Sequence, residues 1–235
     1  MDVVELLPRL RLLRFPVGQA YLWTDDEELT PVDADPKGCG TAIADVVRAV
    51  GRDPSEVRRI VLTHFHDDHM SAASELTALR RGARHPLDPP VVRGAVPGTP
   101  PVFEEWELPL HAEAVRHLPA GGPVRPARVV EVSDGDVLDF GGGARVVHAP
   151  GHTHGSVGIH LPEHGVLFTG DAVASSPVHG VLLGVFDVDR AAAVRSFHRL
   201  AGLPADVACS GHGDPVIGRA GAALRESADR HEATP

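Results

Sequence analysis

Histidine and aspartate residues gather in four short motifs that lie far apart along this chain. The motifs are His64-Phe65-His66-Asp67-Asp68-His69, Gly151-His152, Thr169-Gly170-Asp171 and Gly211-His212-Gly213. Imidazole nitrogens and carboxylate oxygens are the usual protein ligands of zinc and related ions. The ligands of a zinc finger lie close together in sequence, whereas these extend from residue 64 to residue 212. The spacing therefore predicts a metal centre that a whole domain must fold to assemble.

The first motif carries enough ligands for two ions. It follows the apolar run Arg59 to Thr63, which predicts a buried strand. Extended backbone beyond that strand would place His64 and His66 on the same side, where they can share one metal. Asp68 and His69 follow as the chain turns toward a predicted helix, so their side chains point elsewhere and can hold a second ion. Two ions roughly 3.5–4 Å apart are the arrangement of binuclear hydrolases.

The motifs HFHDDH, PGHTHGS (residues 150–156), FTGD (ending at residue 171) and SGHGDP (residues 210–215) occur in an order that resembles the metallo-β-lactamase superfamily. The glyoxalase II-like branch is the most similar. The resemblance implies a first metal bound by His64, His66 and His152, and a second bound by Asp68, His69 and His212. It implies that Asp171 bridges the two ions. Asp33 is similar to the family's early aspartate, and Asp67 occupies a variable position without an assigned role.

This resemblance implies a binuclear metal-dependent hydrolase acting on a thioester, ester or lactone. Its cofactors would be two divalent ions, with zinc expected and iron or manganese as alternatives. Metal coordination lowers the pKa of water from ~15.7 toward ~7, so hydroxide is available without a serine or cysteine nucleophile. Asp68 is expected to orient it as the catalytic residue. In the family that this sequence resembles, glyoxalase II enzymes hold glutathione with lysine and tyrosine side chains, and the acyl-homoserine lactonases use a tyrosine downstream of the first cluster. The only lysine and tyrosine here, Lys37 and Tyr21, precede the first motif. The resemblance therefore disfavours a glutathione thioester and an acyl-homoserine lactone as substrates.

Two other functions remain open at this point. A mononuclear iron oxygenase resembling the persulfide dioxygenases would use the first-site histidines with Asp171 and would not need the second set. A non-catalytic metal-binding protein would need no catalytic residue at all. The number and identity of the bound ions separate the first alternative from the hydrolase, and a hydrolysis assay separates the second.

Hydrophobic periodicity predicts strands that alternate with helices. The predicted strands are Ala20–Trp23, Ile60–Thr63, Arg128–Val132, Ala144–Ala149, Val157–Leu161, Val166–Thr169 and Val207–Ser210. The predicted helices are Thr41–Val50, Ser71–Arg81, Glu104–His117, Arg190–Ala201 and Arg219–Arg230. The pattern suits an α/β (α+β) fold, the four-layer αββα sandwich that the resemblance implies, as a single domain over residues 1–235.

Two segments are candidates for the wall of a substrate pocket. The first is a variable insertion around residues 85–118, which opens with an irregular stretch, residues 85–101, that contains six prolines. It either lies over the metals or is a surface excursion docked by Trp106. The second candidate is the segment 172–186. The roles of His154 and His179 stay open.

Composition points to a cytoplasmic enzyme with a small-molecule substrate. The net charge of −10 disfavours nucleic acid as a partner, because no basic stripe is available to neutralise phosphates. Charged residues interrupt the apolar residues of the segment 1–16, unlike a signal peptide, and no segment reaches transmembrane length, so no membrane partner is expected. The two cysteines, Cys39 and Cys209, suggest no disulfide framework. The oligomeric state cannot be predicted.

Overall fold

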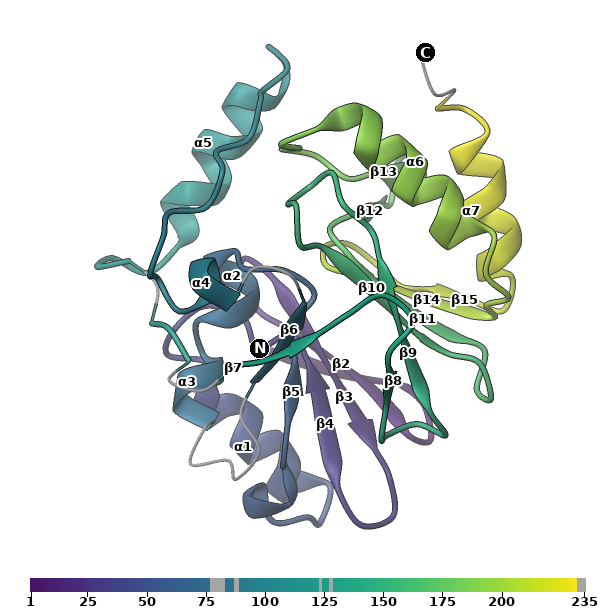
Figure 1. Cartoon of the computed structure of the whole chain (residues 1–235). Helices are drawn as coiled ribbons and strands as arrows, with labels where there is room; N and C mark the ends of the chain where they lie inside the picture. The colour runs from purple at the N-terminus through teal and green to yellow at the C-terminus, as the bar shows by residue number, and fades with distance from the viewer. Residues whose placement is uncertain (77–82, 87–88, 123, 127–128, 232–235) are drawn as a thin grey trace. The chain divides into compact units, whose positions relative to one another are not determined.

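The computed structural model describes residues 1–76, 83–86, 89–122, 124–126 and 129–231 (Figure 1). It divides into two compact units. The first consists of Met1–Gly98 with Glu113–Glu131, and the second of Thr99–Ala112 with Val132–Pro235. Each unit has its own sheet and its own buried core, and each carries part of the predicted ligand set.

The first unit is built on a seven-stranded sheet whose strands follow sequence order. These are β1 (Asp2–Leu7), β2 (Leu10–Arg14), β3 (Gln19–Thr24), β4 (Leu29–Val32), β5 (Ile60–Val61), β6 (Ala83–Pro86) and β7 (Val129–Val132). The first four strands pair antiparallel, whereas β4, β5 and β6 pair parallel. Parallel strands end at the same edge of a sheet. Asp33, which follows β4, and His64, which lies beyond β5, are therefore directed to one edge.

Helices cover one face of this sheet (Figure 1). They are α1 (Gly40–Ala49), α2 (Asp67–Met70), α3 (Ala73–Leu76), α4 (Pro89–Val92) and the short 3₁₀ helix η1 (Pro54–Glu56). In α1 the buried residues Ile43, Val46 and Val47 recur at helical spacing and form the face that packs on the core. Ile60 of β5 is completely buried beneath them. Burying one such aliphatic side chain stabilises a fold by roughly 1.5–3 kcal/mol.

The second unit contains a six-stranded sheet and a separate two-stranded ribbon. The sheet order is β15 (Val216–Ile217), β14 (Val207–Ser210), β11 (Val166–Gly170), β10 (Val157–Leu161), β9 (Ala144–His148) and β8 (Val137–Leu138), and the ribbon pairs β12 (Val173–Ser176) with β13 (Gly180–Leu183). Because β10 is antiparallel to both β9 and β11, and β14 is parallel to β11, the strands β9, β11 and β14 run in one direction. Their carboxyl ends therefore share an edge, and the predicted ligands of this unit follow those ends.

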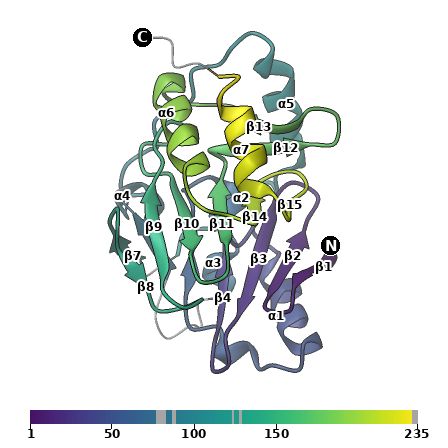
Figure 2. The same ribbon diagram turned by 90° about the vertical axis from the view of Figure 1, so that its right-hand side faces the viewer.

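Helices α6 (Arg190–Ala201) and α7 (Ala220–Ala228) lie side by side across this sheet (Figure 2). Phe197 and Leu200 of α6 and Leu224 of α7 are completely buried against the sheet residue Leu167. The amino terminus of α6 is capped by Asp189, whose side chain accepts a hydrogen bond from the Ala192 amide at 2.9 Å. These contacts fix the layer that supports the ligand-bearing loops.

Helix α5 (Glu107–His117) crosses the boundary between the units along the chain. It begins three residues later than the predicted start at Glu104. A turn precedes it, in which the Glu107 amide donates to the backbone oxygen of Glu104 at 3.0 Å and the Glu107 carboxylate accepts from the Glu104 amide at 2.9 Å. Within this helix Glu107 alone is buried. The helix therefore presents mostly exposed side chains, and its burial is concentrated on one acidic residue.

The prediction of one helix over Ser71–Arg81 was wrong in its start and its continuity. The helix begins at Asp67 as α2, breaks, and resumes as α3; residues 77–81 of the prediction lie outside the described residues. The break arises because the Ala72 amide donates to the backbone oxygen of Asp35 at 3.0 Å instead of continuing the helix. Residue 128 of the predicted strand also lies outside the described residues.

The stretch 85–101 is less irregular than its prolines predicted, because it includes the end of β6 and all of α4. The strands of the amino-terminal hairpin, β1 and β2, were not predicted. Helix α6, by contrast, has the predicted bounds. Among the described residues, no helix combines the length and the apolar character needed to cross a membrane.

Candidate metal centre

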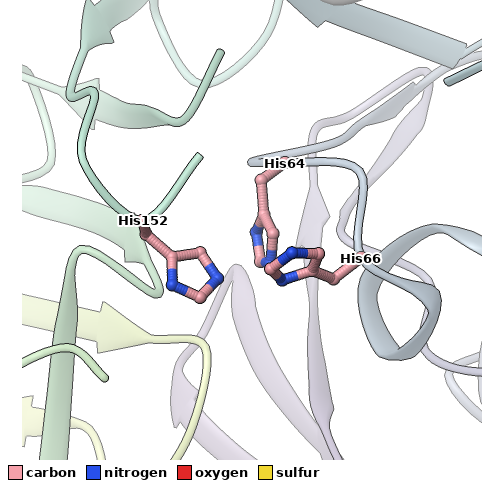
Figure 3. Close-up of side chains that lie close together, drawn as sticks. All are labelled: His64, His66 and His152. Carbon is pink, nitrogen blue, oxygen red and sulfur yellow. The ribbon is translucent and has the colours of Figure 1, made fainter. Parts of the chain in front are cut away.

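His64 lies at the centre of the ligands of the first unit. Its ring is completely buried and lies 4.7 Å from the ring of His66 and 4.1 Å from that of His69, centroid to centroid. His66 is the residue before α2, so its extended backbone leads directly into the helix that carries Asp68 and His69. Figure 3 draws the rings of His64 and His66, together with that of His152 from the second unit. The close histidines of the first unit agree with the predicted ligand cluster.

Asp33 orients two of these rings through one carboxylate. It accepts hydrogen bonds from the amide and the hydroxyl of Thr63, both at 2.8 Å, and from Nδ1 of His69 at 3.0 Å. Because the single hydroxyl proton of Thr63 goes to Asp33, its Oγ1 accepts from Nδ1 of His64 at 3.0 Å. Both imidazoles are thereby held with Nε2 available to a metal, which is the usual arrangement around a bound ion.

Asp33 adopts a left-handed backbone conformation with φ of 61° and is almost completely buried. Such a conformation is uncommon outside glycine, although aspartate tolerates it better than most residues. It turns the side chain back toward the loop that follows β5. The family resemblance pointed to this aspartate, and the structure gives it the physical role of holding His69 and Thr63.

The two aspartates of the first motif lie in different surroundings. Asp68 Oδ2 is 3.8 Å from Nε2 of His69, and its side chain is 19% exposed. Burial raises the pKa of Asp67, Arg125 opposes this effect, and the neighbouring carboxylate of Asp68 adds to it. Asp68 thus faces Nε2 of His69, the other residue of the first motif that was predicted to bind the second metal, while Asp67 keeps no assigned ligand role.

In the second unit, His152 is fixed by a backbone carbonyl. Its Nδ1 donates to the oxygen of Val185 at 2.9 Å, which leaves Nε2 directed at Asp171 Oδ2, 3.6 Å away. The preceding Gly151 has φ of 138°, and a Cβ added there would lie 2.2 Å from the amide nitrogen of Ala193. Only glycine permits this close packing of the His152 loop on α6.

Asp171 and His212 follow the neighbouring parallel strands β11 and β14, so the sheet brings them together. Nε2 of His212 lies 3.3 Å from Asp171 Oδ2, the same oxygen that His152 approaches. The Asp171 side chain is 13% exposed and that of His212 is 39% exposed. One carboxylate oxygen of Asp171 therefore lies close to the Nε2 atoms of both His152 and His212.

These separations suit ligands that share an ion better than direct hydrogen bonds. Two ligand atoms at 2.0–2.2 Å from a tetrahedral ion are about 3.4 Å apart. The Nε2-to-oxygen distances at His69, His152 and His212 are 3.8, 3.6 and 3.3 Å. Nitrogen and carboxylate donors with the opposite ring nitrogen already fixed are typical of zinc, iron or manganese sites. The donor chemistry of each unit fits a divalent transition ion.

The remaining predicted candidates lie elsewhere or play other parts. The side chains of His154 and His179 are exposed, and the backbone oxygen of His154 accepts a hydrogen bond from the His148 ring at 2.8 Å. Trp106, the proposed anchor of a surface excursion, is 53% exposed. Cys209 is buried, as expected for a small core residue, and neither it nor Cys39 is in a disulfide.

The family resemblance pointed to Asp33, but sequence reasoning missed the other two residues that orient the ligands, Thr63 and Val185. Thr63 precedes His64 directly, and a hydroxyl next to a ligand histidine was the available signal. Val185 acts through its backbone oxygen, which carries no sequence signal. Glu107 and Asp187, two carboxylates of the second unit that are 1% and 3% exposed, were also missed because burial of an acid is visible only after folding.

Comparison with known proteins identifies the family. The family model described as the metallo-beta-lactamase superfamily matches residues 35–212, so the chain belongs to this superfamily. A metallo-beta-lactamase family protein from Thermus thermophilus superimposes with a TM-score of 0.70 at 26% identity, covering 97% of this chain and 80% of that one. These matches confirm the predicted fold class.

Curated relatives agree with the predicted branch. A hydroxyacylglutathione hydrolase of Rhodobacter capsulatus is 31% identical over 199 residues, which is 82% of this chain and 61% of that protein. An acyl-coenzyme A thioesterase of Gallus gallus is 33% identical over 129 residues, covering 48% of this chain and 40% of that protein. Other matched hydroxyacylglutathione hydrolases are covered over about half of their length.

Proposed function

We propose that the protein is a binuclear metal-dependent hydrolase that cleaves a thioester, ester or lactone of a small molecule. His64, His66 and His152 would hold one divalent ion, and Asp68, His69 and His212 the other, with Asp171 shared between them. Zinc is the proposed metal, because mixed nitrogen and carboxylate donors suit it. A cytoplasmic location belongs to the same proposal.

The observation that carries the proposal is the orientation of His69. A residue of the second ligand set is completely buried, and a buried aspartate fixes its ring at 3.0 Å through Nδ1. A buried carboxylate that accepts a hydrogen bond from one ring nitrogen fixes the tautomer and the orientation of the imidazole, and this arrangement is typical of histidines whose other nitrogen binds a metal. A one-metal oxygenase has no need for this pair. The relatives named hydroxyacylglutathione hydrolase and acyl-coenzyme A thioesterase support the choice of reaction.

The side chains would divide the work. Bound divalent ions would supply an activated water nucleophile at neutral pH and polarise the carbonyl of the substrate. Asp68, partly exposed beside His69, would accept a hydrogen bond from the nucleophile and orient it. Asp33 and Thr63 would keep the imidazoles in the tautomer that leaves Nε2 as the metal-binding atom.

Metal content tests the number of ions. The wild-type protein, purified without added metal and then reconstituted with zinc, should contain about two ions per chain. His69→Ala should contain about one ion, and Asp171→Asn should weaken both sites because an amide oxygen serves two ions poorly. His179→Ala is the matched control, since it removes an exposed histidine outside the proposed ligand sets. A single iron in both wild type and His69→Ala as purified, before reconstitution, with oxygen uptake on a persulfide, would establish the oxygenase instead.

Activity tests the reaction. Asp68→Ala should lower kcat/KM on thioesters at least 100-fold while the thermal midpoint changes little, because the residue is partly exposed and its proposed role lies in the reaction. Hydrolysis is followed by thiol release from thioesters with an uncharged leaving group. Full activity in Asp68→Ala would remove its proposed role, and no hydrolysis of any thioester, ester or lactone by the zinc-loaded wild type would overturn the proposed function.

A further inference from the structure

The segment 184–187 of the second unit is packed against two of the proposed ligands. A Cβ on Gly184 would lie 1.8 Å from the backbone oxygen of Asp171, so only glycine fits there. The next residue, Val185, accepts the Nδ1 hydrogen bond of His152 at 2.9 Å. Phe186 therefore directly follows the residue whose backbone carbonyl orients the ring of His152.

Phe186 is held in a strained conformation by a buried acid. Its φ is 62°, which is unusual for a bulky residue and persists only where surrounding contacts enforce it. The Phe186 amide donates to Oε1 of Glu107 at 3.0 Å, while the other carboxylate oxygen accepts from the Glu104 amide at 2.9 Å. The amide of Val102 donates to the backbone oxygen of Asp187 at 2.8 Å. These bonds join the start of α5 to the segment beside His152.

The joined segments bring three aromatic rings together. The ring centroids of Phe103 and His111 are 4.6 Å apart, those of His111 and Phe186 are 5.2 Å apart, and those of Phe103 and Phe186 are 5.9 Å apart. All three residues are only partly buried. Aromatic rings gain from tilted contacts of this kind, and the area they leave open is available to an apolar ligand. The two segments that the sequence offered as alternative pocket walls meet in this cluster.

The negative charge of the segment beside the aromatic cluster bears on which chemical groups can bind there. The segment 99–112 carries three glutamates and neither lysine nor arginine. An anionic group, such as a phosphate or a carboxylate, would be repelled here, whereas an uncharged hydrocarbon group would bury ring surface. A ligand of this surface should therefore be apolar.

We propose that Phe103, His111 and Phe186 bind the apolar acyl group of the substrate, and that Glu107 is a positioning residue that holds Phe186 in place. The inference rests on the proposed hydrolase function and adds its substrate class, thioesters or esters of medium-length aliphatic or aryl acids. The acyl group would lie along the rings with its carbonyl toward the ligands of the second unit.

The test compares acetyl and octanoyl thioesters of N-acetylcysteamine, which share an uncharged leaving group. The wild type should prefer the octanoyl thioester by kcat/KM. Phe103→Ala and Phe186→Gly should each lower the octanoyl rate roughly 10-fold and leave the acetyl rate within about twofold, as expected for lost apolar contacts. Glycine is chosen at position 186 because it accepts a φ of 62° without strain.

Leu108→Ala is the matched control, since it truncates a 52% exposed apolar side chain of α5, the helix that carries His111. It should leave both rates unchanged. Metal content and the thermal midpoint establish that each variant is folded. Unchanged octanoyl-to-acetyl ratios in both ring variants, or a wild-type preference for acetyl, would overturn the acyl site while leaving the hydrolase intact.

Ligand binding separates this inference from the proposed function. N-ethyloctanamide, an amide that carries the octanoyl group and is not a thioester, should bind the zinc-loaded wild type in isothermal titration calorimetry and bind Phe186→Gly at least 10-fold more weakly. If the wild type hydrolyses nothing but binds the amide in this way, the hydrolase function fails and the apolar site stands. If the amide binds both proteins equally, the apolar site is refuted.

Discussion

Asp187 should make the metal-free protein less stable as the pH rises. Both of its carboxylate oxygens are buried and have no hydrogen-bond partner among the described residues, and Arg190 lies 3.8 Å away as an ion pair. Burial raises the pKa of Asp187 from its ordinary 3.8 to about 7, with Arg190 opposing and Glu107, Asp171 and Asp189 adding to the rise. The folded protein therefore keeps a proton that the unfolded chain has lost.

The sign and size of the effect follow from this difference. Below pH 3.8 both states carry the proton, so stability is highest on this account. As the pH rises toward about 7 the unfolded state is increasingly favoured, and each pKa unit corresponds to about 1.4 kcal/mol. Between pH 5 and pH 8 the wild type should lose up to about 2.5 kcal/mol through this one group.

Asp187→Asn tests the reasoning, because asparagine cannot titrate. Urea unfolding at pH 5 and pH 8 in the presence of a chelator gives the free energy of unfolding at each pH. The wild type should lose more stability across this range than the variant does. Glu163→Gln, which removes an exposed acid of the same unit that is not among the charges raising the pKa of Asp187, should change the stability by a similar amount at both values. Equal pH dependence in the wild type and in Asp187→Asn would refute the argument.

Three further changes probe the scaffold of the site. Asp33→Asn should weaken zinc binding roughly 10- to 100-fold in a competition assay with a chromogenic chelator, because it impairs the orientation of His69; unchanged affinity would remove its proposed role. Phe197→Ala should lower the free energy of unfolding by about 3–5 kcal/mol in urea, since it empties the core beneath α6, and a loss below 1 kcal/mol would contradict its burial. Glu28→Gln should destabilise the protein by about 3 kcal/mol in the same assay, because it removes the negative charge that pairs with the buried guanidinium of Arg59; unchanged stability would show that this ion pair does not stabilise the fold.

The sequence determined much of the fold because the strong local signals agreed with the tertiary structure. Helix α6 and strands β10 and β14 have the predicted bounds, since continuous apolar runs and a clean helical period leave few alternatives. The ordered histidine and aspartate motifs predicted the family correctly. The helix predicted from Ser71 failed because its register depends on a hydrogen bond to the backbone of Asp35, a distant contact with no local signature.

The orientation of the ligands was decided by tertiary structure alone. The motifs named His64, His69 and His152, but the groups that fix their rings lie outside these motifs. They are Thr63, directly before the first motif, the distant Asp33, and the backbone oxygen of Val185. A backbone carbonyl is the same group in every residue, so no sequence pattern marks the one that a histidine will contact. The aromatic cluster depended on folding for the same reason. Phe103 and Phe186 are 83 positions apart in sequence, and a buried glutamate is what joins their segments.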